Sequence, residues 1–242
     1  MNPLKHLRLG DLDLAHRDVF DRDIQYIYDE IFPGAAYDHP QIKLPEHATI
    51  MDVGANVGIY SIWAARKYQP RTLLSYEASP TTYECLADNA ARHIDRAVTN
   101  WHCFNLAVSR EAGRELTLNQ PPWNSGFSTL VDGSKLPWVA DLHSKGELIT
   151  HKVQSTSVSH EIATRGLAVV DLLKIDVEGH FVEVLEGIAA VDLGKVRNIV
   201  LEAEYADELG HTRDSLAARL RSMGYTVEAK DAAQIMIYAW RA

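Results

Sequence analysis

Residues 50–61 read IMDVGANVGIYS, an apolar run that ends in an acidic residue and then turns at two glycines. Short apolar runs bounded by turn residues are typical of buried strands. A helical pattern begins near Gly58 and continues to Lys67. A strand, a glycine turn and a helix in this order predict one βα unit of a parallel sheet, with Asp52 at the end of its strand.

The same alternation recurs along the chain and predicts an α/β fold. We expect strands at 49–53, 72–77, 101–108, 172–177, 199–202, 225–229 and 235–240. We expect helices at 58–67, 81–93, 182–190 and 213–223. Parallel strands need such crossover helices, so the pattern predicts a mostly parallel sheet with helices on both faces.

Other segments fall outside this alternation. Residues 115–118 and 152–157 alternate like strands, and the 119–138 loop between them is too long for a plain connector. Near the N-terminus, apolar side chains from Val19 to Ile31 recur at helical spacing, and Pro33 and Gly34 end the pattern. We expect residues 1–48 to form a helical cap or lid segment, and residues 49–242 to form the main domain.

Composition restricts the partners of the chain. It has 242 residues, 46% of them hydrophobic, and a formal net charge of -9. This charge repels a phosphate backbone, so we expect a small-molecule partner and no nucleic acid. Cys85 and Cys103 lack metal-ligand spacing and suit a reducing compartment. No run of about 18 apolar residues occurs, so we expect a cytoplasmic protein without membrane contact, whose association into a homo-oligomer stays open.

Two acidic residues end neighbouring predicted strands, at the sheet edge where parallel α/β proteins bind ligands. Asp52 ends one strand, and Glu77 ends the next about 25 positions later. A carboxylate at the second position commonly accepts hydrogen bonds from ribose hydroxyls, so the pair indicates an adenosine-like ligand. Gly54 and Gly58 would let the backbone approach that ligand closely.

The glycine spacing helps to choose among such ligands. It departs from the Gly-x-Gly-x-x-Gly pattern of dinucleotide sites. A pyrophosphate would also lie close to the negative charge of Asp52, whereas a cationic sulfonium cofactor would not be repelled. The alternative is that both glycines only make a tight turn from strand to helix.

A second group of charges follows another predicted strand. Residues 171–188 read DLLKIDVEGHFVEVLEGI, in which the strand ends in Lys174, Asp176 and Glu178. Burying these charges is costly unless they are paired or functional, so we expect them to face the same crevice. NIVLEAEY at 198–205 repeats the pattern with Glu202 and Glu204. The alternative is a solvated rim of unrelated charges.

Five stretches together resemble the FkbM family of S-adenosylmethionine-dependent methyltransferases over about residues 45–205: DVGANVGIYS, the Glu of SYEASP, LLKIDVEGH, VLEGI and NIVLE. The resemblance implies S-adenosylmethionine as cofactor and a Rossmann-like class I methyltransferase domain over 49–242, with seven strands and the last one antiparallel. It implies these cofactor-binding residues: Asp52, Gly54, Asn56, Gly58, Glu77, Asn105, Ala107 and Asp176. Asp176, Glu178 and His180 would face the methyl group and the acceptor. Phe181 stands where the family usually has Glu.

Methyl transfer to oxygen is an in-line displacement, so the enzyme aligns the acceptor and removes its proton where needed. We predict His180 as the base because its ordinary pKa is nearest neutrality. Asp176 is the second candidate, and Lys174 would orient or pair with one of the carboxylates beside it. A carboxyl acceptor would need no base. Asp176, Glu178 and Glu202 offer hard metal ligands, but no ligand spacing supports a metal, and we predict none.

Acceptor binding is expected at Glu178 and Glu202 and in the 119–138 loop, where Trp123 and Asn124 suit a sugar or an aglycone. NQPPW at 119–123 departs from the Asn-Pro-Pro-aromatic motif of enzymes that methylate amino groups, because Gln120 interrupts it. We therefore predict an O-methyltransferase acting on a hydroxyl of a sugar or a secondary metabolite. The alternatives are methylation of a carboxylate, a nicotinamide-dependent oxidoreductase and a non-catalytic cofactor-binding protein.

Overall fold

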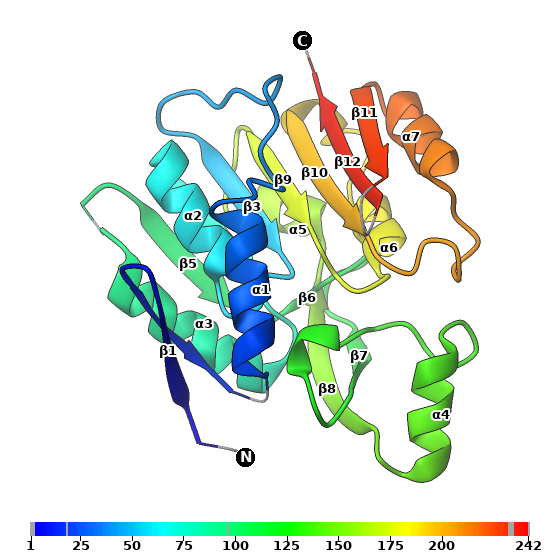
Figure 1. Cartoon of the computed structure of the whole chain (residues 1–242). Helices are drawn as coiled ribbons and strands as arrows, with labels where there is room; N and C mark the ends of the chain where they lie inside the picture. Colours follow the sequence, from blue (N-terminus) through cyan, green and yellow to red (C-terminus); the bar gives the residue numbers. More distant parts are fainter. Residues whose placement is uncertain (1–2, 18, 96, 232–234, 242) are drawn as a thin grey trace.

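A seven-stranded sheet forms the centre of the computed structural model, which describes residues 3–17, 19–95, 97–231 and 235–241 (Figure 1). Its strands lie in the order β11 (Thr226–Asp231), β12 (Ile235–Trp240), β10 (Asn198–Ala203), β9 (Leu172–Ile175), β3 (Thr49–Val53), β4 (Thr72–Tyr76) and β5 (Asn100–Phe104). The pairs from β10 to β5 are parallel, and β12 runs antiparallel to both of its neighbours. The predicted fold class is confirmed.

Helices cover both faces of this sheet because its strands are apolar on both faces. On one face α1 (Asp21–Ile31), α2 (Ile59–Tyr68) and α3 (Pro80–His93) pack on side chains such as Ile50 and Leu172. On the other face α5 (Val158–Thr164), α6 (Phe181–Glu186) and α7 (Arg213–Ser222) pack on neighbours such as Met51 and Leu173. Successive strand residues point to opposite faces, so adjacent residues enter different apolar clusters.

The N-terminal segment is only partly helical. Helix α1 lies where the helical spacing predicted it, but β1 (Lys5–Leu9) and β2 (Leu12–His16) form an antiparallel hairpin ahead of it. The buried Asn89 side chain of α3 holds this hairpin: it accepts from the Ala15 N–H at 2.7 Å and donates to the Ala15 carbonyl at 2.8 Å. A signal for the hairpin exists in the alternating leucines around the Gly10 turn.

The 119–138 loop belongs to a smaller sheet of β6 (Ala107–Val108), β8 (Ile149–Thr156) and β7 (Glu115–Gln120). The predicted strand 101–108 is split between the two sheets, as β5 and β6. Between β7 and β8 lie a 3-10 turn, η1 (Ser125–Phe127), and helix α4 (Pro137–Lys145). Backbone hydrogen bonds between Asn119 and Thr129, 2.8 and 2.9 Å long, close the loop at its base. Another short 3-10 turn, η2 (Leu193–Lys195), precedes β10.

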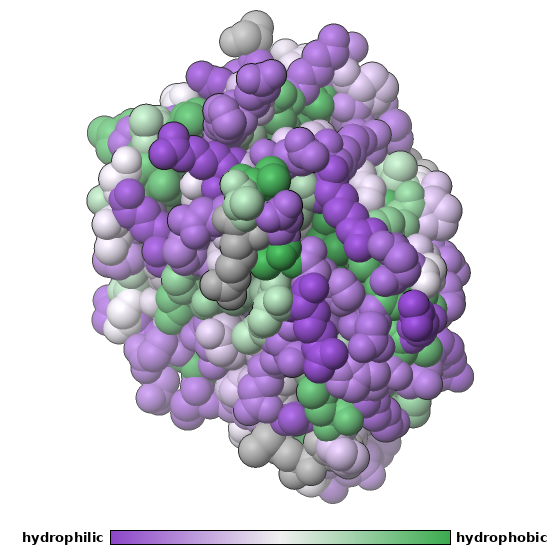
Figure 2. Space-filling view, turned by 90° about the vertical axis from the view of Figure 1, so that its left-hand side faces the viewer, coloured by the Kyte–Doolittle hydropathy of each residue, from purple (hydrophilic) through white to green (hydrophobic). Residues whose placement is uncertain are grey.

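The outer surface shows no large apolar area on the side of the molecule that carries β5 and α3, where hydrophobic residues are scattered among hydrophilic ones (Figure 2). Among the helices of the described residues, none has the length and the apolar character needed to cross a membrane.

The glycine turn after β3 has a structural cause that the sequence did not reveal. Gly54 has a φ of +76°, and a Cβ there would lie 1.6 Å from the Asp176 carbonyl oxygen. Gly58 has a φ of +94° and begins α2, where a Cβ would lie 2.9 Å from Leu86 Cδ1. The missing side chain of Gly54 therefore leaves room for the backbone that follows β9, and that of Gly58 leaves room for α3. The packing of the protein itself requires both glycines, whether or not a ligand binds.

We expect Gly54→Ala to lower the free energy of unfolding by about 3 kcal/mol or more, because the collision is with backbone that cannot move aside. Gly194→Ala is the matched control, since a Cβ there meets no described atom within 4 Å, and it should stay within about 0.5 kcal/mol of wild type. Urea unfolding followed by circular dichroism measures both. Equal stability of the two variants would contradict this explanation of the turn.

Candidate active site

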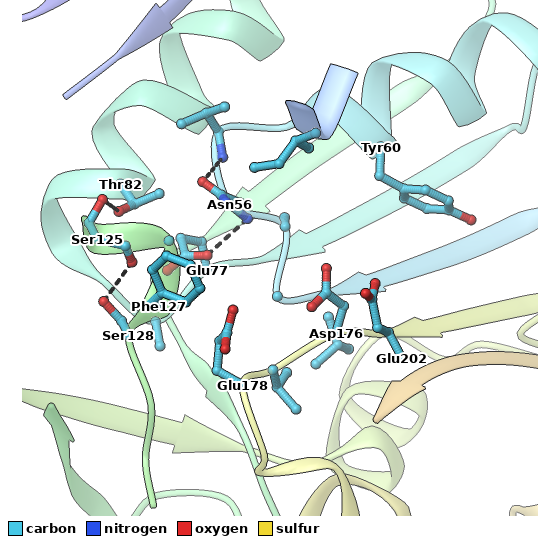
Figure 3. Close-up of a pocket in the computed structure, with 18 of the residues that line it drawn as sticks. Asn56, Tyr60, Glu77, Thr82, Ser125, Phe127, Ser128, Asp176, Glu178 and Glu202 are labelled. Atoms are coloured by element: carbon cyan, nitrogen blue, oxygen red, sulfur yellow. Dashed lines mark hydrogen bonds between the residues drawn. The ribbon is translucent and has the colours of Figure 1, made fainter. Parts of the chain in front are cut away.

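A cavity of about 250 Å³ opens where β3, β4, β9 and β10 end, and residues of the segment 124–128 line its side (Figure 3). Residues of helix α1 line it as well. Seven of its lining residues are acidic: Asp23, Glu30, Glu77, Asp176, Glu178, Glu202 and Glu204. Lys174 is the single basic residue among the described residues that line it. The cavity therefore favours a neutral or positively charged ligand and repels an anion.

The buried ammonium of Lys174 connects the two central strands. Its Nζ donates to the Gly54 carbonyl at 2.7 Å and lies 3.2 Å from Asp52 Oδ1 and 3.1 Å from Asp176 Oδ2. Asp52 and Lys174 are partners in the register of β3 and β9. Burial lowers the pKa of Lys174, but the carboxylates of Asp176 and Asp52 outweigh this effect and raise it above its ordinary value. Lys174 is therefore a charged, paired cation, which is unsuited to act as a base.

Glu77 braces the glycine turn from the next strand. Its carboxylate accepts from the Asn56 N–H at 2.9 Å and from the Ser79 N–H at 2.7 Å. Burial raises the pKa of Glu77 to about 7, although these two N–H groups oppose the rise. A carboxylate oxygen can accept more than one hydrogen bond, so Glu77 keeps capacity to accept from ribose hydroxyls in the cavity.

A cluster of carboxyl groups lies at the ends of β9 and β10. Oxygens of Asp176, Glu202 and Glu204 lie within 4.8 Å of one another. The Tyr37 hydroxyl lies 3.1 Å from Asp176 Oδ2 and also donates to Glu202. These three carboxylates could hold a divalent cation by their chemistry, but the Lys174 ammonium already pairs with Asp176, and the Tyr37 hydroxyl already donates a hydrogen bond to the cluster.

Burial acts to raise the pKa of every member of this cluster, but the net shifts differ in direction. Burial raises the pKa of Glu202 to about 8, and it raises the pKa of Glu204 well above its ordinary value, with Asp176 adding to both effects. For Asp176 burial also acts upward, but the ammonium of Lys174 and hydrogen bonds from Glu204 and Tyr37 together outweigh it and lower the pKa. The cluster therefore combines one carboxyl group whose pKa is lowered with two neighbours whose pKa values are raised.

Most of the sequence-predicted site residues meet at this cavity. Those that line it are Gly54, Asn56, Glu77, Ala107, Asn124, Lys174, Asp176, Glu178 and Glu202. Those outside its lining are Asp52, Gly58, Asn105, Trp123 and His180. Asp52 is fully buried and accepts from the Ser61 hydroxyl at 2.5 Å. Its carboxylate does not line the cavity and can affect a ligand there only by pairing with Lys174, which does line it. Asn105 donates to the carbonyl oxygens of Glu77 and Ala78, which supports the end of β4.

His180 is placed away from the expected acceptor position. It lines a second hollow near β7 and α4, and its Nε2 lies 2.9 Å from the Ser109 hydroxyl. Its Nδ1 lies 3.7 Å from Glu183. Burial lowers the pKa of His180 despite this neighbouring carboxylate. The geometry does not support the prediction that His180 is the base, because the side chain does not border the main cavity.

Several lining residues were not identified from the sequence. Tyr37 follows the helical segment without a motif, and no local signal marks it. On α1, residues Asp23, Tyr26, Ile27 and Glu30 line the cavity at helical spacing. That face could have been found from the periodicity, but only the tertiary structure turns it toward the strand ends. The Asn124 Nδ2 donates to Asp23 at 2.6 Å and joins α1 to the 124–128 segment.

Comparison with known proteins gives consistent matches. The family described as "Methyltransferase FkbM domain" matches residues 52–227. The chain is 30% identical over 232 residues to "Methyltransferase sdnD" of Sordaria araneosa, covering 88% of this chain and 86% of that one. It is also 30% identical over 231 residues to "31-O-demethyl-FK506 methyltransferase FkbM" of Streptomyces tacrolimicus, covering 86% and 84%. A crystal structure of a methyltransferase FkbM from Methylobacillus flagellatus shares the fold, with a TM-score of 0.55, 11% identity, and coverage of 88% of this chain and 48% of that one.

Replacing Lys174 by Met should lower the free energy of unfolding by about 3–5 kcal/mol, because Asp52 and Asp176 would lose their buried counter-charge. Lys152→Met on the exposed side of β8 is the control and should change it by less than about 1 kcal/mol. Denaturant unfolding at neutral pH tests both. A Lys174→Met protein as stable as wild type would show that the ion pairs contribute nothing to the fold.

Proposed function

This chain belongs to the FkbM methyltransferase family, and we propose that it transfers the methyl group of S-adenosylmethionine to a hydroxyl of a small molecule, a sugar or a secondary metabolite. Membership of this family excludes the nicotinamide-dependent oxidoreductase considered above. The choice of a hydroxyl is supported by the carboxyl groups around the cavity, whose oxygens can accept a hydrogen bond from a hydroxyl, and by Asp176, whose lowered pKa keeps a negative charge that disfavours a carboxylate acceptor.

The residues of the cavity suit the cofactor. A ligand with a positive sulfur and a positive amino group is favoured by the excess of acidic lining residues. Glu77 would accept from the ribose hydroxyls, Asn56 and Ala107 would contact the nucleoside, and Asp176 would face the positively charged end. When bound, S-adenosylmethionine supplies an electrophilic methyl group on its sulfonium.

The contribution of the protein is alignment and proton removal. Lys174 holds Asp176 and the Gly54 backbone in one arrangement, so the cofactor end of the cavity is rigid before the ligand arrives. From the other side α1 and the segment 124–128 face the strand ends, and Tyr26 and Phe127 there offer apolar surface for the body of an acceptor. The acceptor hydroxyl would thereby meet carboxylates that are able to take its proton.

The function is tested by incubating the protein with S-adenosylmethionine and a panel of sugars, phenols, aliphatic alcohols and carboxylic acids. We expect methyl ethers, which resist mild alkali. Methyl esters, which alkali hydrolyses to methanol, would instead identify a carboxylate acceptor. Calorimetric titration with S-adenosylhomocysteine and NAD in parallel checks the cofactor site without an acceptor; binding of NAD alone would contradict it.

Cofactor affinity should depend on pH through Glu77. Below its raised pKa of about 7 the carboxyl group is protonated, and above it the carboxylate accepts fully from ribose hydroxyls. S-adenosylhomocysteine should therefore bind more tightly as the pH rises from 6 to 8, and the ionisation of Glu77 should increase its affinity by up to about tenfold. Glu77→Gln should bind more weakly and lose this slope, while the exposed control Glu115→Gln keeps it. A slope retained in Glu77→Gln would exclude the assignment.

A further inference from the structure

Four acidic side chains surround the centre of the cavity in Figure 3, and three of them are engaged elsewhere. Asp176 pairs with Lys174, Glu77 accepts two backbone N–H groups, and Glu202 accepts from Tyr37. Glu178 differs from these three. Its carboxyl group points into the cavity between Phe127 and Asp176 and accepts a hydrogen bond from Tyr205.

The backbone of Glu178 is held in an unfavourable conformation. Its φ is +48°, a left-handed value that costs a residue with a side chain about 1 kcal/mol or more. The Thr129 hydroxyl donates to the Glu178 carbonyl at 2.6 Å, and buried Thr129 is itself fixed by two backbone hydrogen bonds to Asn119. The base of the 119–138 loop thus maintains a strained turn, and that turn directs a carboxyl group into the cavity.

We propose that Glu178 is the base that takes the proton from the acceptor hydroxyl, an assignment that rests on the proposed hydroxyl methylation. The O–H bond breaks and its proton ends on the Glu178 carboxylate. The acceptor oxygen uses the freed electron pair to bond the methyl carbon, and the carbon–sulfur pair stays on sulfur. The carboxylate and the sulfonium are both neutral after the step, so charge balances.

The surroundings of Glu178 also suit a base. Burial raises its pKa well above the ordinary value, and the nearby carboxyl groups of Asp176 and Glu202 add to the rise, whereas the hydrogen bond from Tyr205 opposes it. Glu204 faces the same group from the end of β10. A carboxylate with a raised pKa is a stronger base than an ordinary one. The rate should therefore increase with pH as Glu178 loses its proton, and then reach a plateau.

Glu178→Gln tests the assignment because it keeps size and hydrogen bonding but removes the base. With a hydroxyl substrate from the panel, kcat should fall by about 100-fold or more and the pH dependence should disappear. Affinity for S-adenosylhomocysteine should stay within about twofold of wild type, which also shows that the variant folds. Acidic phenols that are already ionised should be methylated by Glu178→Gln at nearly the wild-type rate.

Three further variants separate this role from a structural one. Thr129→Val should lower kcat less than Glu178→Gln and leave cofactor affinity unchanged, because it releases the strained turn but keeps the carboxylate. Glu115→Gln on the outer end of β7 should match wild type. If His180→Ala or Asp176→Asn abolished the pH dependence while Glu178→Gln retained activity and slope, the proposal would be overturned.

The proposed function and the Glu178 assignment would fail in different proteins. If the wild-type protein formed only methyl esters, hydroxyl methylation would be wrong, and no base would be needed because a carboxylate acceptor is already ionised. Failure of the Glu178 assignment would appear only in the variant, as undiminished formation of methyl ethers.

Discussion

The buried ammonium of Lys174 is the interaction on which the arrangement of the site depends. Three oxygen atoms surround it, from Asp52, Asp176 and the Gly54 carbonyl, and the observed register of β3 and β9 is the one that brings these groups together. A buried carboxylate without this cation would be costly. The glycine turn follows from the same constraint, because the Asp176 backbone occupies the space that a Cβ at Gly54 would need.

The carboxyl groups of this small cavity differ in pKa because only one of them is paired with the ammonium of Lys174 in the cavity. Asp176 faces Lys174 and has a lowered pKa, while burial raises the pKa of Glu77, Glu178 and Glu202. Groups of the same chemical type thus divide into one whose pKa is lowered by a paired cation and three whose pKa values are raised by burial. Environment separates their roles, as in other enzymes where two carboxyl groups perform different tasks.

The side of the cavity where we propose that the acceptor binds is built by segments that lie far apart in the sequence. Helix α1 and the segment 124–128 meet over the strand ends, where Asn124 donates to Asp23. Farther in, Tyr37 reaches the carboxyl cluster from the N-terminal segment. Because outer segments of this kind commonly carry binding surfaces, we propose that selection of the acceptor resides here.

The sequence by itself determined the strands of the central sheet, helices α1, α2, α3, α6 and α7, and the acidic ends of β3, β4, β9 and β10, because hydrophobic periodicity and turn residues are local signals. It did not reveal the β1–β2 hairpin, α4 or α5. It also pointed to FkbM-like chemistry through five ordered stretches, and the family match confirmed this. Only the tertiary structure decided which charged side chains face the cavity: Asp52 points inward to Lys174, His180 borders another hollow, and Glu178 enters the cavity. Side-chain direction at a strand end depends on register and on the packing of distant segments, which no local pattern contains.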